Sequence, residues 1–100
     1  MTIQQATEQE IQAFLDELDS WTVKGDKLHR EYKSQDFVQA FGFMAQAALL
    51  AERADHHPEW CNIYNRVVVD LQTHEAQGIT EKEFGLARGM ERIARALMGE

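Results

Sequence analysis

One segment of the chain, residues 35–54, constrains the fold more than any other, because it is apolar on two sides at helical spacing. The two apolar stripes lie on opposite sides of the predicted helix: one comprises Phe37, Val38, Phe41, Met44, Ala45, Ala48 and Leu49, and the other comprises Ala40, Phe43, Ala47 and Leu50. A helix with a solvated side would carry charged residues there. Both sides therefore require cover.

The length of the chain limits what can supply that cover. A chain of 100 residues builds one domain with one modest core, which we assign to residues 1–100. We expect the stripe of Phe37 and Phe41 to pack on the protein's own sheet, and the stripe of Phe43 and Leu50 to meet a second copy of the chain. The alternative is a small domain that buries this helix on both sides. We favour a homo-oligomer.

The flanking segments predict two further helices and four strands. Capping boxes at Thr7–Glu10 and Thr80–Glu83 predict the starts of two helices. The first covers residues 8–18, and the second continues through the apolar positions of residues 86–97. Period-two patterns and turn residues predict two hairpins, with strands at 21–24, 28–33, 60–64 and 67–73. In the second hairpin we place the turn at Asn65-Arg66.

The order of these elements indicates the fold class. Pro58 disfavours helical geometry at the residue before it, so the central helix should end near Asp55 or His56. The resulting order, α-β-β-α-β-β-α with short links between strands, predicts an α+β fold: a four-stranded antiparallel sheet with three helices packed on one face.

Composition and charge exclude several classes of function. Seventeen acidic and ten basic residues give a net charge of −7, and no Lys/Arg cluster could contact a phosphate backbone, so direct nucleic-acid binding is disfavoured. No apolar run approaches the length of about 18 residues that spans a membrane, and the first ten residues lack an apolar secretion signal. The single cysteine, Cys61, fits a reducing compartment, and we expect a cytoplasmic protein.

The histidines are the candidate functional residues. His56 and His57 are adjacent where the central helix ends, and His74 ends the last predicted strand. Adjacent side chains diverge by about 100° on a helix and about 180° on a strand, so the pair is poorly placed to hold one metal ion. No cysteine-rich set or His-Glu-x-x-His spacing supports zinc either. Two interpretations remain, structural histidines or a site of proton transfer.

Local charges favour proton transfer. Glu52 stands four residues before His56, where a carboxylate can orient the imidazole, and the C-terminal end of a helix favours imidazolium. We therefore expect His56 to donate a proton. His57, which the following proline forces out of helical geometry beside Trp60, is expected to occupy a more apolar pocket as a neutral acceptor.

An ordered set of residues around these histidines matches a known pattern. The run Glu52-x-x-x-His56-His57-Pro58 is followed by Tyr64 after five residues and by His74 after nine more. Supporting segments are Asp36-Phe37, Ala40–Met44, Glu59-Trp60, Asn65 and Thr73–Glu75. From about Trp21 to Ala94 the chain resembles the pterin-4a-carbinolamine dehydratases. It departs where the family signature ends in Asp, because this chain has Glu83 there.

The resemblance implies a fold, an assembly and a reaction. It implies an α+β protein that forms dimers and tetramers with the central helix at the interface. The implied reaction is dehydration of 4a-hydroxytetrahydrobiopterin, a pterin-4a-carbinolamine, to quinonoid dihydropterin. This step recycles the tetrahydrobiopterin used by aromatic amino-acid hydroxylases, which are the implied pathway partners. The resemblance implies no metal and no organic cofactor.

The resemblance also implies the site residues. The catalytic set is His56, His57 and His74, and the substrate-binding set is Glu52, Asp55, Trp60, Thr73, Glu75 and Glu83. We expect His57 to take the proton of the ring nitrogen, and His56 and His74 to serve the departing hydroxyl. Glu83 has a second interpretation, because at the third position of its capping box it can cap the last helix with no catalytic role.

A binding module is the alternative to the enzyme. Animal members of the family also act as dimerisation cofactors of a homeodomain transcription factor, so the fold does not decide the function. The three histidines favour catalysis, because a scaffold gains nothing from an acid–base trio in one cleft. The sequence leaves the natural pterin and any additional protein partner open.

Overall fold

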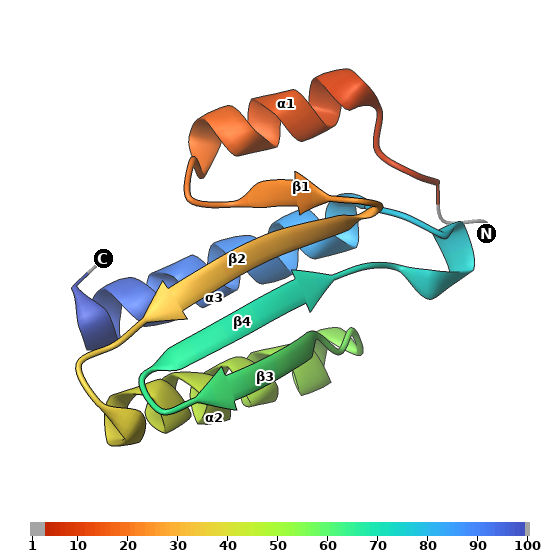
Figure 1. The fold of residues 1–100 in the computed structure, drawn as a ribbon. Helices are drawn as coiled ribbons and strands as arrows, with labels where there is room; N and C mark the ends of the chain where they lie inside the picture. Colours follow the sequence, from red (N-terminus) through yellow and green to blue (C-terminus); the bar gives the residue numbers. More distant parts are fainter. Residues whose placement is uncertain (1–3, 100) are drawn as a thin grey trace.

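The computed structural model describes residues 4–99 of the chain. The prediction of one domain over residues 1–100 extends past the described residues at both ends. The elements are, in order, α1 (Glu8–Glu17), β1 (Thr22–Lys24), β2 (Lys27–Lys33), α2 (Phe37–Ala54), β3 (Glu59–Ile63), β4 (Arg66–Leu71), the short 3₁₀ helix η1 (His74–Ala76) and α3 (Glu81–Met98) (Figure 1). The predicted α+β fold and its order of helices and strands are confirmed.

The four strands form one antiparallel sheet in the order β1-β2-β4-β3. Its inner face is apolar; among its buried side chains are Leu28, Tyr32, Val67, Val69 and Leu71. Helices α2 and α3 run behind this face, while α1 lies beside β1 (Figure 1). Phe14 of α1 stacks on Phe84 of α3 with ring centroids 4.6 Å apart, so α1 is joined to the helical layer through α3.

The two apolar stripes of α2 are reversed relative to our expectation. Phe43, predicted to meet a partner chain, is wholly buried in the core and lies 4.5 Å from the ring of Tyr32. Phe37 and Phe41, predicted to pack on the sheet, are 49% and 56% exposed. The physical reason is the size of the residues, because the stripe built on alanines around Phe43 lets α2 approach the sheet and α3 closely.

The second hairpin differs from the prediction by one residue. The turn between β3 and β4 consists of Tyr64 and Asn65, and Arg66 already belongs to β4. Tyr64 adopts a left-handed conformation with φ of 52°, and Asn65 is tied to the preceding loop because its side-chain amide donates to the carbonyl of Ser34. The side-chain amide of Asn65, rather than Arg66, therefore stabilises the turn.

A buried carboxylate anchors α3 to the sheet. Glu91 accepts hydrogen bonds from the indole Nε1 of Trp21 at 2.9 Å, Nε of Arg30 at 3.0 Å and the hydroxyl of Tyr32 at 2.7 Å. Burial alone would raise the pKa of Glu91, but the bonds from Tyr32 and Arg30 outweigh burial and hold that pKa below its usual range. Helix α3 is thus held to the sheet by a charged network as well as by apolar packing.

The described helices also bear on the membrane question. None of α1, α2 and α3 has the length and apolar character required to span a bilayer.

Candidate functional site

The end of α2 sends two consecutive histidines into different environments. Asp55 caps the helix in the left-handed region, with φ of 52°, and the backbone N–H of His56 returns to the carbonyl of Ala51 at 3.0 Å. Pro58 follows, and β3 begins at Glu59, so the predicted end of the helix is confirmed. The side chain of His56 is buried, whereas that of His57 is 61% exposed.

His74 comes from the segment that leaves β4. That strand ends at Leu71 rather than at Thr73, and a backbone bridge between Thr73 and Gly78 closes a small loop that contains η1. His74 therefore begins a 3₁₀ turn instead of ending a strand, and its side chain is 80% exposed. The loop carries it to the same end of the sheet as the end of α2.

These two segments enclose a small open pocket of about 250 Å³. Its lining residues are Asp55, His56, His57, Gln72, Thr73, His74, Glu75 and Lys82. The structure therefore brings the three predicted histidines to one pocket, together with three of the six residues expected to bind substrate.

His56 contacts a buried carboxylate. Its Nε2 lies against Oε2 of Glu83, and among the described residues it has no other polar partner. Glu83 also accepts a hydrogen bond at 2.6 Å from the backbone N–H of Thr80, which completes the capping box of α3. Glu83 thus caps the helix with one oxygen and contacts His56 with the other.

The expected pairing of Glu52 with His56 is wrong. Oε1 of Glu52 lies 3.0 Å from Nε2 of His57, because the left-handed residue at the helix end turns His56 inward and leaves His57 near the last turn of α2. The apolar pocket expected around His57 is also absent, since its side chain is largely exposed. Glu52 does not line the pocket but contacts a histidine that does.

His74 belongs to a line of charges on the open face of the sheet. Its Nε2 lies 3.8 Å from Oε2 of Glu59, whose other oxygen accepts a hydrogen bond of 2.7 Å from Lys27. Glu59 is therefore shared between the first hairpin and the pocket. The weak contact and the high exposure leave His74 the least constrained of the three histidines.

Trp60 is the predicted site residue that the structure places elsewhere. It stands opposite Val69 on the inner face of the sheet, is half-buried and packs against the core. Conversely, Gln72 and Lys82 line the pocket but were not predicted from the sequence. The position of Lys82 beside Glu83, in the first turn of a capped helix, is the signal that would have identified it.

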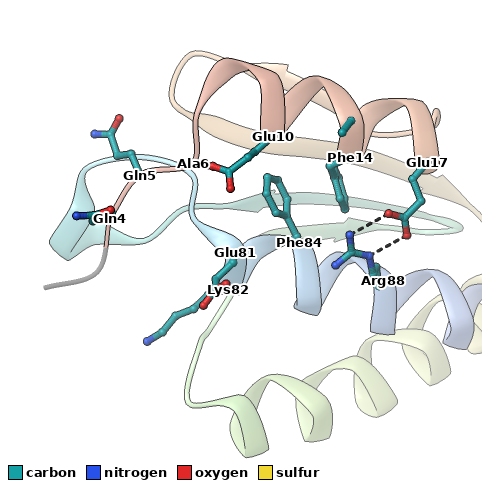
Figure 2. Close-up of a pocket in the computed structure, with 11 residues that line it drawn as sticks. Gln4, Gln5, Ala6, Glu10, Phe14, Glu17, Glu81, Lys82, Phe84 and Arg88 are labelled. Carbon is teal, nitrogen blue, oxygen red and sulfur yellow. Dashed lines mark hydrogen bonds and ion pairs between the residues drawn. The ribbon is translucent and has the colours of Figure 1, made fainter. Parts of the chain in front are cut away.

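A second and larger cavity, of about 720 Å³, lies between α1 and the start of α3 (Figure 2), and no histidine is among its lining residues. The stacked rings of Phe14 and Phe84 form its wall, and Arg88 makes two hydrogen bonds, of 2.8 and 2.9 Å, to Glu17. Because these charged groups satisfy one another, we locate the candidate site at the smaller, histidine-lined pocket. Among residues 4–99, no group of three His, Cys, Asp or Glu side chains is arranged to hold a metal ion.

Most of the chain is similar to known proteins of one family. The sequence model of the family described as pterin 4 alpha carbinolamine dehydratase matches residues 4–93. A protein of Solibacter usitatus, provisionally named a pterin-4-alpha-carbinolamine dehydratase, is 57% identical over 88 residues, which are 88% of this chain and 93% of that protein. A protein of Rhizobium johnstonii with the same provisional name is 50% identical over 86 residues, which are 84% of this chain and 85% of that protein.

A solved structure shares the fold as well as the sequence. The crystal structure of a protein from Brucella melitensis, described as a transcriptional coactivator/pterin dehydratase, superposes with a TM-score of 0.86 at 52% identity. The match covers 90% of this chain and 98% of that chain.

Proposed function

This chain belongs to the pterin 4 alpha carbinolamine dehydratase family, and we propose that it removes water from a pterin-4a-carbinolamine by acid–base catalysis at the histidine-lined pocket. The observation that carries the proposal is the convergence of His56, His57 and His74 on one pocket from two segments of the chain. Environments that differ between neighbouring titratable groups are what separate acid from base roles in one site.

The reaction requires one proton to arrive and another to leave. The bond between C4a and the hydroxyl oxygen breaks as an acid protonates the hydroxyl, which departs as water. A base takes the proton of the neighbouring ring nitrogen, and a double bond forms between that nitrogen and C4a to give quinonoid dihydropterin. Acid and base must therefore lie on either side of the reacting atoms. Imidazoles can carry both protons, so the proposal includes no metal and no organic cofactor.

His57 is the proposed base. The carboxylate of Glu52, 3.0 Å from Nε2, favours the tautomer with its proton on that nitrogen and leaves Nδ1 free to accept.

His56 is the proposed acid. Its contact with the buried Glu83 occupies Nε2, so Nδ1 is the nitrogen that serves the hydroxyl. We assign His74 to the same hydroxyl from the other segment, and we propose that Asp55 and Glu75, which line the pocket, bind the pterin ring.

The test is turnover of freshly generated 4a-hydroxytetrahydropterin, followed by the absorbance of the quinonoid product. The parent protein should accelerate the dehydration, and a chelator in the buffer should leave the rate unchanged. A rate no faster than the buffer alone would contradict the proposal. We further propose a cytoplasmic role in recycling tetrahydrobiopterin after an aromatic amino-acid hydroxylase has used it.

We also propose that the protein is a homo-oligomer, a dimer or a tetramer, through the outer face of α2. Large apolar side chains lie exposed on α2, at the end of β3 and on the turn that follows it: Phe37, Val38, Phe41, Leu49, Ile63 and Tyr64. Several exposed large apolar side chains on one helix are typical of an interface between chains. The same surface supports a second candidate function, binding of another protein, since the similar Brucella melitensis protein is described as a coactivator as well as a dehydratase.

A further inference from the structure

Two helices of this chain begin with the same capping arrangement in opposite environments. In α1 the backbone N–H of Thr7 donates to Glu10 at 2.8 Å, and both residues lie on the surface or close to it. In α3 the backbone N–H of Thr80 donates to Glu83 at 2.6 Å, and both residues are wholly buried. A cap whose only role is to begin a helix does not need to be buried, because water can satisfy its polar groups.

The buried cap is extended by a second hydroxyl. Oγ1 of Thr73, on the loop that precedes His74, lies 2.7 Å from one oxygen of Glu83 and 2.9 Å from the other. It also lies 3.0 Å from Oγ1 of Thr80. Thr73 is 3% exposed, so its hydroxyl is part of this buried cluster although the residue lines the pocket.

The donors in this cluster are directed toward Glu83. Each hydroxyl has one hydrogen to donate, and an ionised carboxylate only accepts. Oγ1 of Thr80 accepts from the backbone N–H of Lys82, so its own hydrogen is directed to Oε1 of Glu83 or to Thr73, and the hydrogen of Thr73 passes to Glu83. Hydroxyls linked in this way polarise one another, and the helix N-terminus adds to the stabilisation of the negative charge.

We propose that Thr80 is a positioning residue for the dehydratase site, which acts through Thr73 and Glu83 to hold a negative carboxylate against Nε2 of His56. The consequence is that the ring of His56 is held with Nε2 against Glu83 and Nδ1 directed to the substrate. This inference rests on the proposed function and changes two expected roles. Thr73 and Glu83, expected to bind substrate, instead orient His56, because their polar atoms are already committed to each other.

The experiment compares Thr80→Val with Thr7→Val, which removes the equivalent hydroxyl from the surface cap. Protonation of His56 is followed by its ¹⁵N chemical shifts as the pH is varied, and kcat and KM are measured at a temperature at which circular dichroism shows each variant folded. The other titratable groups of the pocket, Asp55, His57, His74, Glu75 and Lys82, are the same in both variants.

We expect Thr80→Val to lose the His56 proton at a lower pH than the parent, and to lower kcat about 10-fold while KM changes little, a part of the roughly 10²–10⁴-fold that a positioned acid contributes. Thr80→Ser, which keeps the hydroxyl, should restore both properties. Thr7→Val should leave both unchanged. Thr73→Val should reproduce the loss without altering a helix cap, and it provides the test if Thr80→Val does not fold.

Unchanged His56 protonation in Thr80→Val, or in Thr73→Val where that variant replaces it, would overturn the inference. An equal change in Thr7→Val would do the same, because the effect would then belong to helix capping in general. The ¹⁵N comparison needs no turnover, so it decides the role of Thr80 even if the parent protein does not dehydrate the pterin. Absence of that turnover would instead overturn the proposed function.

Discussion

Leu50 of α2 occupies the space directly above Gly89 of α3, where a side chain of any size on Gly89 would meet its Cδ2 atom. The two helices thus approach each other at a residue without a side chain. Gly89→Ala should therefore displace Leu50, although alanine favours the helix. Gly85→Ala is the matched control, since it lies on the same helix with open space around it and is exposed.

We expect Gly85→Ala to raise the free energy of unfolding by about 0.5–1 kcal/mol through helix propensity. Gly89→Ala should be less stable than Gly85→Ala by about 1 kcal/mol, the lower end of the usual cost of overpacking, because the atom that must move is the end of the flexible Leu50 side chain. Urea unfolding followed by circular dichroism measures both. Equal stability of the two variants would show that Leu50 is free to move aside.

The buried network around Glu91 should govern the acid stability of the protein. Its pKa is below the ordinary value of 4.5 when folded, so between the two values the unfolded chain binds more protons than the folded one. The stabilisation is therefore complete above about pH 4.5 and is lost as the pH falls through the lowered pKa.

Glu91→Gln should remove that dependence and lower the free energy of unfolding by about 3 kcal/mol, because one charge of the buried pair between Glu91 and Arg30 is removed. The control is Glu17→Gln, whose partner Arg88 lies in an exposed pair, and it should have a much smaller effect. Urea unfolding between pH 3 and 7 measures both variants. A Glu91→Gln curve parallel to that of the parent would contradict the assignment.

The three histidines should differ in what their removal costs. His57→Ala should lower kcat by about 10²–10⁴-fold, and more than either other variant, since we assign His57 alone to the ring nitrogen. His56→Ala and His74→Ala should each retain partial turnover, and their double variant should be almost inactive. Parent-like kcat and KM in all three single variants would replace the catalytic role with a binding role.

Stability should separate His56 from His74. His56→Ala leaves the wholly buried Glu83 without its imidazole and should lower the free energy of unfolding by about 3 kcal/mol. His74→Ala should have no measurable effect on unfolding, because that side chain is largely exposed. Unfolding curves recorded beside the kinetics check the difference, and similar losses in both variants would contradict it.

The outer face of α2 should hold the oligomer together. Phe41→Asp should give a folded protein of lower mass in sedimentation at micromolar concentration, because an exposed apolar side chain is replaced by a charge. Phe43→Asp should instead unfold the chain, since Phe43 is wholly buried. A parent protein that sediments as a monomer at this concentration would rule out the proposed assembly.

The sequence predicts the helices and strands of this protein better than it predicts how they pack together. Hydrophobic period and capping boxes located the three α-helices and four strands of residues 4–99 to within a few residues, because these signals are local, but they missed the 3₁₀ helix η1. They did not show which side of α2 faces inward. That choice depends on whether small residues such as Ala47 and Gly89 allow two helices to approach, which is a property of the facing surfaces.

The site shows the same division. The sequence identified the histidines and the carboxylates, but it paired Glu52 with His56 on helical spacing. The one residue in a left-handed conformation at Asp55 invalidates that spacing, and the true pairs are Glu52 with His57 and Glu83 with His56. Spacing along an ideal helix does not extend across its end.

The left-handed turn at Asp55 also means that the main chain determines how the surroundings of His56 and His57 differ. Two chemically identical side chains follow it, and the direction of the backbone alone makes one an interior group and the other a surface group. Changes to the pocket lining can tune either imidazole separately, but exchanging their surroundings would require α2 to end elsewhere. In the proposed mechanism, the direction of proton transfer therefore depends on where the main chain of α2 ends.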